Sequence, residues 1–402
     1  MTTRTYRAEA FLNAAARLGL TVTVGTEREQ TLAHHTPGAG LTIDDWAGDR
    51  AREQIVEFAH RFPLDAVVGV DDDTIVLAAR ASAVLGLPHN SVESVQASRY
   101  KDVMRVALAE SDVLSPRFEV IGIDDDPAVA ATRQAYPVVL KPLALSASRG
   151  VIRADDDRQF VAAFREVSAI LAEAGLEPGD AGSRQVLVEA FIPGAEVALE
   201  GLLDDGRLTV LALFDKPDPL DGPYFEESIY LTPSRLPDAT QQAIADTVIR
   251  AARALGLRHG PLHAELRLND RGAWIVEVAA RSIGGQCSRS LRFDHDLSLE
   301  EIILRQAARL PIPNLVRERC ASGVMMIPVP RAGVLRAVGG LDQARAVPGI
   351  DDLTITIARG QPVIPLPRGA SYLGFIFARA DTPAAVERSL REAHRQLEFE
   401  IE

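Results

Sequence analysis

Apolar and polar residues recur along this chain with changing spacings that mark off three successive units. In the first unit, apolar positions three and four residues apart indicate helices, and short apolar runs between them indicate strands. We expect helices over 8–18 and 50–60, strands over 21–25 and 66–70, and a helix that is capped by Asp71-Asp72-Asp73 and ends near Gly86. This alternation predicts an α/β domain with a parallel sheet over 1–95. Such a domain normally opens with a strand, so either the edge strand is absent or the natural start codon lies upstream.

The second unit, residues 96–310, mixes helices with strands of alternating pattern. The expected helices cover 99–110, 157–174 and 237–255, and the expected strands cover 118–121, 137–141, 185–189, 196–203 and 207–214. A hairpin follows, with strands over 263–267 and 275–281 around a turn at Asn269-Asp270-Arg271-Gly272. Residues 216–236 are rich in Pro, Asp and Glu, which indicates a mobile loop.

The third unit, residues 311–402, begins at Pro311-Ile312-Pro313. Its pattern predicts strands over 323–329, 334–338, 353–357 and 371–378, closed by a helix over 383–397. We therefore expect a C-terminal α+β domain that is rich in strands.

Composition narrows the classes of protein that fit this pattern. The 402 residues suit two or three domains, and 47% hydrophobic with 25% charged residues match a globular protein. The net charge of −13 argues against nucleic acid or an anionic membrane as the main partner, although a local basic pocket can still bind a nucleotide. No apolar run reaches transmembrane length and no signal peptide is visible. The two cysteines lack metal-type spacing and fit a reducing cytoplasm.

The hairpin carries the most informative chemical pattern. Pairing centred on Arg271 sets Glu265 opposite Glu277. Opposed carboxylates destabilise a sheet unless a cation lies between them, and oxygen ligands without a dedicated cage suit Mg²⁺ that carries a substrate phosphate. An exposed hairpin, whose charges are solvated or paired with Arg267 and Arg281, is the alternative. The faces predicted by period-two alternation hold His263, Glu265 and Arg267 on the first strand, and Ile275, Glu277, Ala279 and Arg281 on the second.

Two earlier segments have features of a nucleotide site. An apolar strand ends in Lys141 and is followed by small and hydroxyl residues, whose backbone N–H groups and Ser hydroxyls can surround phosphate oxygens. The spacing matches neither the P-loop nor the dinucleotide fingerprint, and an ordinary β-turn also fits. Farther on, the backbone of 189–192 can hydrogen-bond a purine edge and Glu196 can accept from ribose hydroxyls, or the segment is simply a hinge between two strands.

Taken in chain order, these pieces resemble the ATP-grasp fold over nearly the whole chain. The order is a helix-borne lysine at Lys101, the strand lysine Lys141 with its small-residue loop, a Glu-hinge-Glu segment and the carboxylate hairpin ending in Arg281. The resemblance implies an N-terminal α/β pre-domain (1–95), an ATP-grasp domain of two lobes with the nucleotide between them (96–310) and a C-terminal α+β domain (311–402).

The resemblance also implies roles for individual residues. Lys101 and Lys141 would hold the ATP phosphates, and the loop with Ser146, Ser148 and Gly150 would close over them. Glu189, Phe191 and Ile192 would form the adenine hinge, and Glu196 would bind ribose. Glu265 and Glu277 would bind Mg²⁺ or Mn²⁺, and Arg281 would stabilise the acyl-phosphate step. The usual hairpin reads Glu-x-Asn, whereas this chain has Ala279, so the number of metal ions is open. Glu277-x-Ala-Ala-Arg281 is similar to the pattern of bacterial L-amino-acid ligases that form dipeptides.

The implied activity is that of an ATP-dependent ligase, which converts a carboxylate into an acyl phosphate and joins it to an amine. The expected partners are small-molecule substrates, and a homodimer is compatible with the family. His263 is a candidate general base, or a core histidine with a structural hydrogen bond. Lid candidates are residues 146–150 and 216–236, where Glu226 and Glu227 would meet a substrate ammonium or be solvated.

Some assignments stay open. Arg289 and Arg292 would pair with a substrate carboxylate or balance surface charge. A biotin-carboxylase-like or formate-using enzyme shares the same layout. A non-catalytic ATP-binding regulatory protein is the alternative that Ala279 favours.

Overall fold

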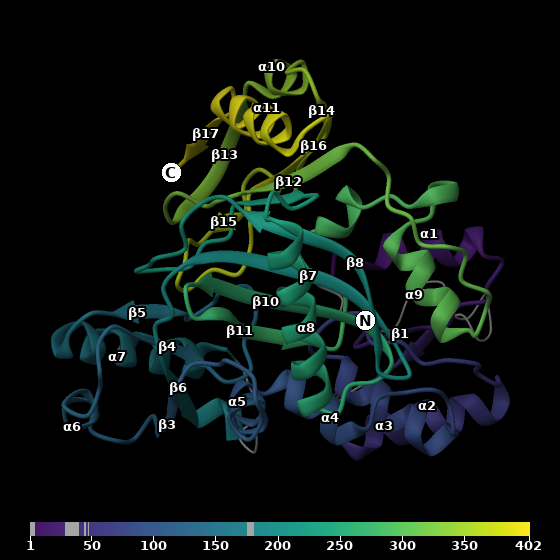
Figure 1. The fold of residues 1–402 in the computed structure, drawn as a ribbon, viewed down its shortest axis with the longest axis horizontal. Coiled ribbons are helices and arrows are strands. Elements are labelled where there is room, and N and C mark those ends of the chain that lie inside the picture. Colours follow the sequence, from purple (N-terminus) through teal and green to yellow (C-terminus); the bar gives the residue numbers. More distant parts are fainter. Residues whose placement is uncertain (1–4, 29–39, 44–45, 47, 175–180) are drawn as a thin grey trace.

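The computed structural model describes residues 5–28, 40–43, 46, 48–174 and 181–402. Figure 1 shows a long antiparallel sheet across the middle of the molecule and a smaller sheet at the lower left. The N-terminal segment, in purple, lies at the right, and the C-terminal unit, in yellow, stands at the top. This combination confirms the α/β (α+β) class. Among the described residues, no helix has the length and apolar character needed to cross a bilayer.

The N-terminal unit contains a two-stranded parallel sheet and the three expected helices. Its elements are α1 (Ala8–Arg17), β1 (Val24–Thr26), β2 (Gly40–Thr42), α2 (Asp49–Arg61) and α3 (Ile75–Leu85). Gly86 ends α3 in the left-handed conformation, with φ of 66°. The strand expected over 66–70 is wrong. Those residues belong to no strand, and the Val70 carbonyl accepts from the Arg7 guanidinium at 2.6 Å.

The small sheet forms the first lobe of the central unit. Its strand order is β3 (Phe118–Gly122), β6 (Gln185–Ala190), β4 (Val138–Pro142) and β5 (Ile152–Ala154), with α6 (Pro127–Ala131), α7 (Asp157–Glu173) and the 3₁₀ turn η2 (Ala181–Arg184) alongside. Phe160, Phe164 and Val167 of α7 are buried against this sheet. Because successive positions on this face of α7 are apolar, the sequence pattern located the helix correctly.

The helix expected over 99–110 is confirmed over 101–109, and a separate helix that the sequence analysis missed precedes it. α4 (Val92–Arg99) and α5 (Lys101–Ala109) are separated by Tyr100, whose backbone is extended. At the break, the Lys101 amide donates to the Leu143 carbonyl at 3.2 Å, which ties the start of α5 to the end of β4. The break therefore brings Lys101 to the same end of the lobe as Lys141.

The long sheet is the scaffold of the second lobe. Its order is β11 (Gly272–Ala279), β10 (Gly260–Asn269), β7 (Ala195–Asp204), β8 (Arg207–Lys216), β9 (Ile229–Thr232), β12 (Ala321–Ile327), β16 (Gly374–Ala380) and β14 (Ile350–Ile355). α8 (Asp238–Ala254) and α5 pack on one face, where Met104, Val248 and Leu266 share a core. The prediction of a loop throughout 216–236 is wrong at β9, because its apolar side chains are buried and its backbone pairs with β12.

The last part of the chain extends this sheet and adds a small one. The expected C-terminal strands and closing helix are confirmed to within a few residues as β12, β13 (Gly333–Gly339), β14, β16 and α11 (Pro383–Arg395). The sequence pattern missed α10 (Leu341–Arg345), β15 (Pro362–Val363), β17 (Glu398–Ile401), the turns η3 (Cys287–Ser290) and η4 (Asp294–Asp296), and α9 (Leu299–Ala307). α9 begins with a capping box between Ser298 and Glu301.

Candidate active site

A cleft lies where the small sheet faces the β10–β11 hairpin. It brings together residues that are far apart in sequence, and its walls include Lys101, Lys141, Ser146, Ser148, Glu189, Phe191, Ile192, Glu196, Glu265 and Glu277. Its volume of about 100 Å³ is below the range of about 300–1,000 Å³ that is typical of small-molecule pockets. A nucleotide would therefore need the covering loop to move. Of the other predicted site residues, Gly150 adjoins the wall residue Val151, while His263 and Arg281 are not among the residues that line the cleft.

The hairpin pairs as the sequence predicts at its chemical centre, since Glu265 lies opposite Glu277. A bulge then shifts the register, so that Leu266 faces Ile275 and Val276 is the extra residue. Ile275 is fully buried with Leu266, and its predicted place on the Glu277 face is wrong. The Val276 carbonyl accepts from Arg105 at 2.5 Å, which fixes the bulge.

Three carboxylates of the cleft surround one buried lysine that the sequence reasoning did not identify. The Lys216 ammonium lies 2.7 Å from Glu196, 2.5 Å from Glu227 and 2.9 Å from Glu265. Burial opposes the charge, but the three carboxylates outweigh it and raise the Lys216 pKa well above its usual value. Burial and the neighbouring Glu265 raise the pKa of Glu227 to about 7. The sequence could have indicated this contact, because pairing the predicted strands that follow each other as β7 and β8 places Glu196 opposite Lys216.

The donor set of this cluster fits a hard divalent cation. One oxygen from each of Glu196, Glu227 and Glu265 lies within 4.8 Å of the others. Such an all-carboxylate set suits Mg²⁺ or Mn²⁺. The structure thus groups Glu265 with Glu196, which was expected to bind ribose, and with Glu227, which was expected in the lid. Glu277 forms its ion pair with Lys101, at 3.9 Å. The opposed carboxylates of the hairpin are each balanced by a lysine.

The two lysines expected at the phosphates point into the cleft from different elements. Lys141 contacts Glu189 at 2.7 Å, and Lys101 donates to the Leu145 carbonyl at 2.9 Å. Glu189 also accepts from the fully buried Arg105 at 2.6 Å. The Glu189 side chain is committed to these two cations, so any contribution to an adenine hinge would come from its backbone.

The pH dependence of folding provides a test of this buried ion pair. Burial alone would raise the Glu189 pKa, but Arg105 and Lys141 lower it to about 2, against 4.5 for the ordinary side chain. A carboxylate with a depressed folded-state pKa stabilises the fold above the unfolded pKa and loses that contribution as pH falls toward 2. We expect about 3 kcal/mol to be lost over this window, measured as urea unfolding against pH. Glu189→Gln should flatten that slope, and an unchanged slope would contradict the assignment.

The loop over the cleft, residues 146–150, has a tightly turned backbone of the kind that can surround phosphate oxygens. Ala147 and Ser148 adopt left-handed conformations, with φ of 56° and 54°, and Gly150 has φ of 75°. A side chain at Gly150 would meet Pro142 at 2.8 Å, so glycine is required there. The Gly150 amide donates to the Pro367 carbonyl at 2.8 Å, which ties the loop to the C-terminal unit. Below it, the Phe191 ring lies between the guanidinium groups of Arg153, at 4.2 Å, and Arg267, at 5.0 Å.

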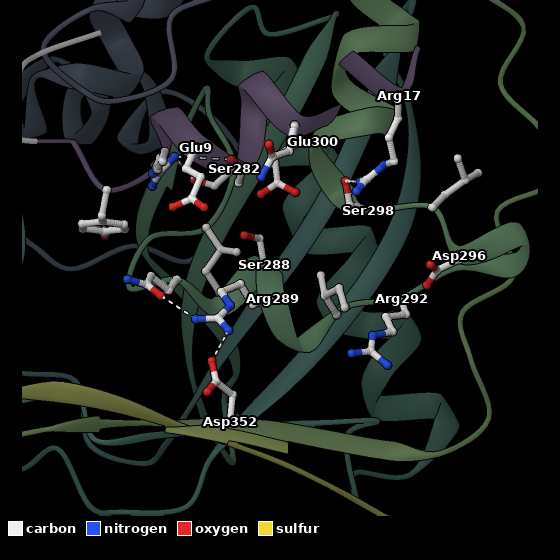
Figure 2. Close-up of a pocket in the computed structure, with 18 of the residues that line it drawn as sticks. Glu9, Arg17, Ser282, Ser288, Arg289, Arg292, Asp296, Ser298, Glu300 and Asp352 are labelled. Carbon is white, nitrogen blue, oxygen red and sulfur yellow. Dashed lines mark hydrogen bonds and ion pairs between the residues drawn. The ribbon is translucent and has the colours of Figure 1, made fainter. Parts of the chain in front are cut away.

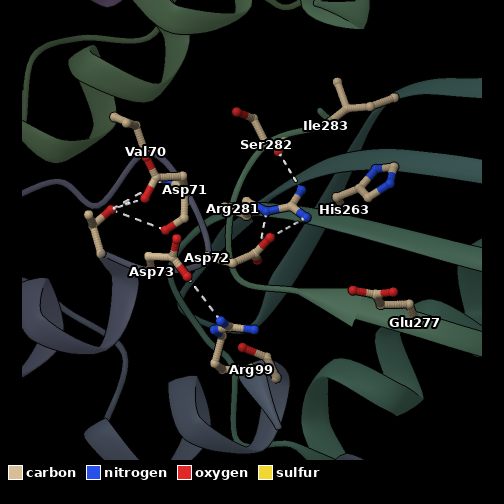
Figure 3. Close-up of polar contacts among 12 residues, drawn as sticks. Val70, Asp71, Asp72, Asp73, Arg99, His263, Glu277, Arg281, Ser282 and Ile283 are labelled. Carbon is tan, nitrogen blue, oxygen red and sulfur yellow. Dashed lines mark hydrogen bonds and ion pairs between the residues drawn. The ribbon is translucent and has the colours of Figure 1, made fainter. Parts of the chain in front are cut away.

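Arg281 is held by the N-terminal unit (Figure 3). Its Nε and Nη2 each donate to one oxygen of Asp72 at 2.8 Å, a bidentate pair. Despite burial, this pair lowers the Asp72 pKa and raises that of Arg281. The prediction that 71–73 cap a helix is wrong, because the N-cap of α3 is Thr74 and makes no side-chain cap bond. Asp73 instead pairs with Arg99 at 3.0 Å.

Asp72→Asn should destabilise the protein by about 3 kcal/mol, because the buried Arg281 would lose its counter-ion. Asp73→Asn is the matched control. The Asp73 side chain is 66% exposed, and removal of its charge should cost less than about 1 kcal/mol. Chemical unfolding of both variants measures the difference, and equal losses would show that the Asp72 pair does not hold the N-terminal unit in place.

His263 is buried between two carboxylates, with Nδ1 3.3 Å from Glu200 and Nε2 3.5 Å from Glu265. Burial would lower its pKa, but these neighbours raise it to about 9. An imidazolium at neutral pH has no free lone pair to accept a proton from an amine. The geometry therefore favours the structural alternative for His263 over the role of general base.

The arginines that follow the hairpin are engaged by the C-terminal unit. Arg289 forms an ion pair with Asp352 and lies over the Phe377 ring at 4.2 Å, and Arg292 is 3.3 Å from Asp351. In this structure their charges are balanced within the protein rather than presented free to a substrate carboxylate.

Three family models match successive parts of the chain. They are the ATP-grasp N-terminal domain over residues 12–89, the ATP-grasp domain over 134–290 and the L-amino acid ligase C-terminal domain 2 over 325–402. Each match falls inside one of the three units expected from the sequence.

Curated relatives include an alanine–anticapsin ligase and a dapdiamide A synthase. Alanine–anticapsin ligase of Bacillus subtilis is 27% identical over 286 residues, 67% of this chain and 60% of the relative. Dapdiamide A synthase of Enterobacter agglomerans is 27% identical over 236 residues, 58% of this chain and 54% of the relative. The chain thus spans about three fifths of the length of the curated relatives it matches.

Solved structures are similar over the whole chain. An L-amino acid ligase from Bacillus licheniformis superposes with a TM-score of 0.84 at 25% identity, covering 100% of this chain and 98% of that one. Phosphoribosylglycinamide synthetase from Anaerococcus prevotii has a TM-score of 0.69 at 15% identity with the same coverage, which shows the shared fold. The expected ATP-grasp fold is confirmed.

Proposed function

We propose that this chain, which belongs to the ATP-grasp superfamily, is an ATP-dependent ligase that joins the carboxylate of an amino acid or a related acid to an amine. The observation that carries the proposal is the cleft in which Lys101 and Lys141 face the Glu265–Glu277 hairpin. The similarity of its C-terminal part to the L-amino acid ligase domain, and the names of its relatives, support an amino-acid substrate.

The reaction proposed has two steps. A carboxylate is a poor electrophile, so the γ-phosphoryl group of ATP is transferred to it, giving an acyl phosphate and ADP. The amine then attacks the acyl carbon, an amide forms and phosphate leaves. Positioning and charge neutralisation supply most of the catalysis of phosphoryl transfer. When bound to Glu265 and Glu277, with Glu196 and Glu227 close by, Mg²⁺ or Mn²⁺ would neutralise phosphate charge.

The protein's own residues then have distinct tasks. Lys101 and Lys141 bind phosphate oxygens, Phe191 and Ile192 hold the adenine through backbone and ring contacts, and Glu196 binds ribose. The loop with Ser146, Ser148 and Gly150 closes over the triphosphate and excludes water from the acyl phosphate. Arg281, kept in place by Asp72, holds the oxyanion of the second step.

Glu227 is the residue we propose for the substrate ammonium. Its carboxylate accepts from the Tyr230 hydroxyl at 2.7 Å and sits at the wall of the cleft. A cytoplasmic location, a homodimer and the domain boundaries 1–95, 96–310 and 311–402 belong to the same proposal.

Trapping of the acyl phosphate tests the first step. With Mg-ATP, single amino acids and hydroxylamine, the ligase should form the amino-acid hydroxamate, because hydroxylamine attacks an acyl phosphate. A carboxylase-like enzyme would instead require bicarbonate, and a formate-using one would require formate. ATP binding with no hydroxamate from any acid would favour the regulatory alternative, to which the buried Ala279 lends weight.

A further inference from the structure

A second, larger cleft lies next to residues 282–292, which follow the β10–β11 hairpin (Figure 2). It is bounded by α1, the η3 turn, the start of α9 and the edge of β14, and its volume is about 790 Å³. Its walls share no residue with the nucleotide cleft. Glu9, Arg17, Ser288, Arg289 and Glu300 line it. The size falls within the range of about 300–1,000 Å³ that holds small organic ligands.

Glu300 is the unusual residue of this cleft. It is only 7% exposed, and within the described part of the chain its carboxylate has no hydrogen bond and no ion pair. Figure 2 shows Glu300 directed into the cleft, which Glu9 from α1 also lines. Glu300 stands in the first turn of α9, where the helix dipole favours a carboxylate only modestly. A buried carboxylate in this setting is suited to a cation supplied by a ligand.

The other charges of the cleft show which sign of ligand it accepts. Arg17 is bonded to Glu301 at 2.8 Å, Arg289 to Asp352, and Arg292 lies 3.3 Å from Asp351. Arg7 donates to the carbonyls of Val70 and Ser282. Across the described residues that line the cleft, the charged groups without a hydrogen bond or ion pair are the carboxylates of Glu9, Asp296 and Glu300. The charged side chains that line the cleft are four arginines and four carboxylates, and three of these carboxylates have no ion-pair partner among the residues that the structure describes and remain available to a cation of a ligand.

The ligand is an organic cation rather than a metal ion. A metal needs several ligand atoms close together, and among the described residues the one such group is Glu196, Glu227 and Glu265 in the other cleft. Asn13, Ser288 and Ser298 line the same cleft and offer neutral donors and acceptors, which suit the remainder of a small polar molecule.

We propose that this cleft binds the primary ammonium group of an amino acid or a short peptide, with Glu300 as its main partner and Glu9 as the second. The preference for an organic ammonium follows from the cleft itself, and the choice of an amino acid or peptide as its carrier rests on the proposed function. The wall includes Ser282, the residue after Arg281, so the bound molecule would be either the amine substrate or an effector of the same chemistry.

Binding to the full chain without ATP tests the site. Calorimetry or NMR titration with a panel of amino acids and dipeptides should detect binding to the wild type, and N-acetylation of the same ligands should abolish it. Glu300→Gln should weaken binding at least about 10-fold, the loss expected for one charge-assisted hydrogen bond. Glu9→Gln, at an exposed position, should weaken it less without affecting the fold.

Glu93→Gln is the matched control, because Glu93 also follows a Ser N-cap by two residues but is exposed, on α4. It should bind the panel like the wild type. Equal affinity of Glu300→Gln and wild type, equal binding of N-acetylated ligands, or no binding by any member of the panel would each overturn the site.

Steady-state kinetics of amide formation distinguish an amine substrate from an effector as the molecule that carries the ammonium. If Glu300→Gln raises the KM for the amine, the ligand is the substrate, and if it changes kcat with KM constant, the ligand is an effector. The protein could also bind the ligands through their ammonium group, lose that binding in Glu300→Gln, and yet form no amide. That result would support the proposed binding site while contradicting the proposed ligase function.

Discussion

Glu277→Gln should reduce amide formation at least about 100-fold while the fold stays intact, because a residue that positions charge at phosphoryl transfer typically contributes factors of this size. Glu277 is partly exposed at the cleft and has one cation nearby, Lys101 at 3.9 Å. The isosteric amide keeps the packing but removes the charge that would bind Mg²⁺. Turnover with saturating Mg-ATP, together with circular dichroism and thermal unfolding, measures the two effects separately.

A control for this variant lies elsewhere in the chain. Glu93→Gln removes an exposed carboxylate of α4 and should leave turnover unchanged. Wild-type activity in Glu277→Gln would contradict the proposal that Glu277 binds the metal ion.

Lys216→Met should lower the free energy of unfolding by about 3–5 kcal/mol at pH 8 without divalent metal, because removal of one partner of a buried ion cluster leaves the other charges uncompensated. Glu196, Glu227 and Glu265 would then repel one another around an apolar side chain. The measurement is made at pH 8 because Glu227, with a pKa of about 7 beside Lys216, is ionised there in the wild type, whereas loss of Lys216 raises that pKa. Lys216→Arg keeps the charge and should lose much less.

The same variant reports on metal binding. If the three carboxylates bind Mg²⁺, addition of the ion should raise the unfolding midpoint of Lys216→Met more than that of the wild type, since the metal replaces the missing ammonium. Equal shifts in both proteins would show that this cluster is not the metal site.

Local patterns were sufficient for the hairpin. Period-two alternation and a turn at Asn269-Asp270-Arg271-Gly272 set Glu265 against Glu277, and the pairing is confirmed. The bulge at Val276 was not predictable from the local pattern, and the bulged residue accepts from the Arg105 guanidinium of another element. In the same way the sequence did not reveal β9 within a Pro- and Asp-rich segment, because its pairing with β8 and β12 is what makes it a strand.

The electrostatics of the site depend on contacts between distant segments. Lys216 and Glu265 are 49 residues apart, Arg105 and Glu189 are 84 apart, and Asp72 and Arg281 are 209 apart. Nothing in the local sequence around Asp72 distinguishes an ion-pair partner from a helix cap, so the acidic triplet was assigned to the wrong task. Residue types predicted the chemistry of the cleft, but the fold decides which carboxylate each cation meets.

The most direct test of the central claim is product formation from Mg-ATP and a matrix of amino acids and small carboxylic acids, followed by phosphate release and mass spectrometry. The account predicts ADP, phosphate and a condensed amide for at least one pair, with the masses naming both substrates. Tight ATP binding without an amide from any pair, or turnover that requires bicarbonate or formate, would contradict it.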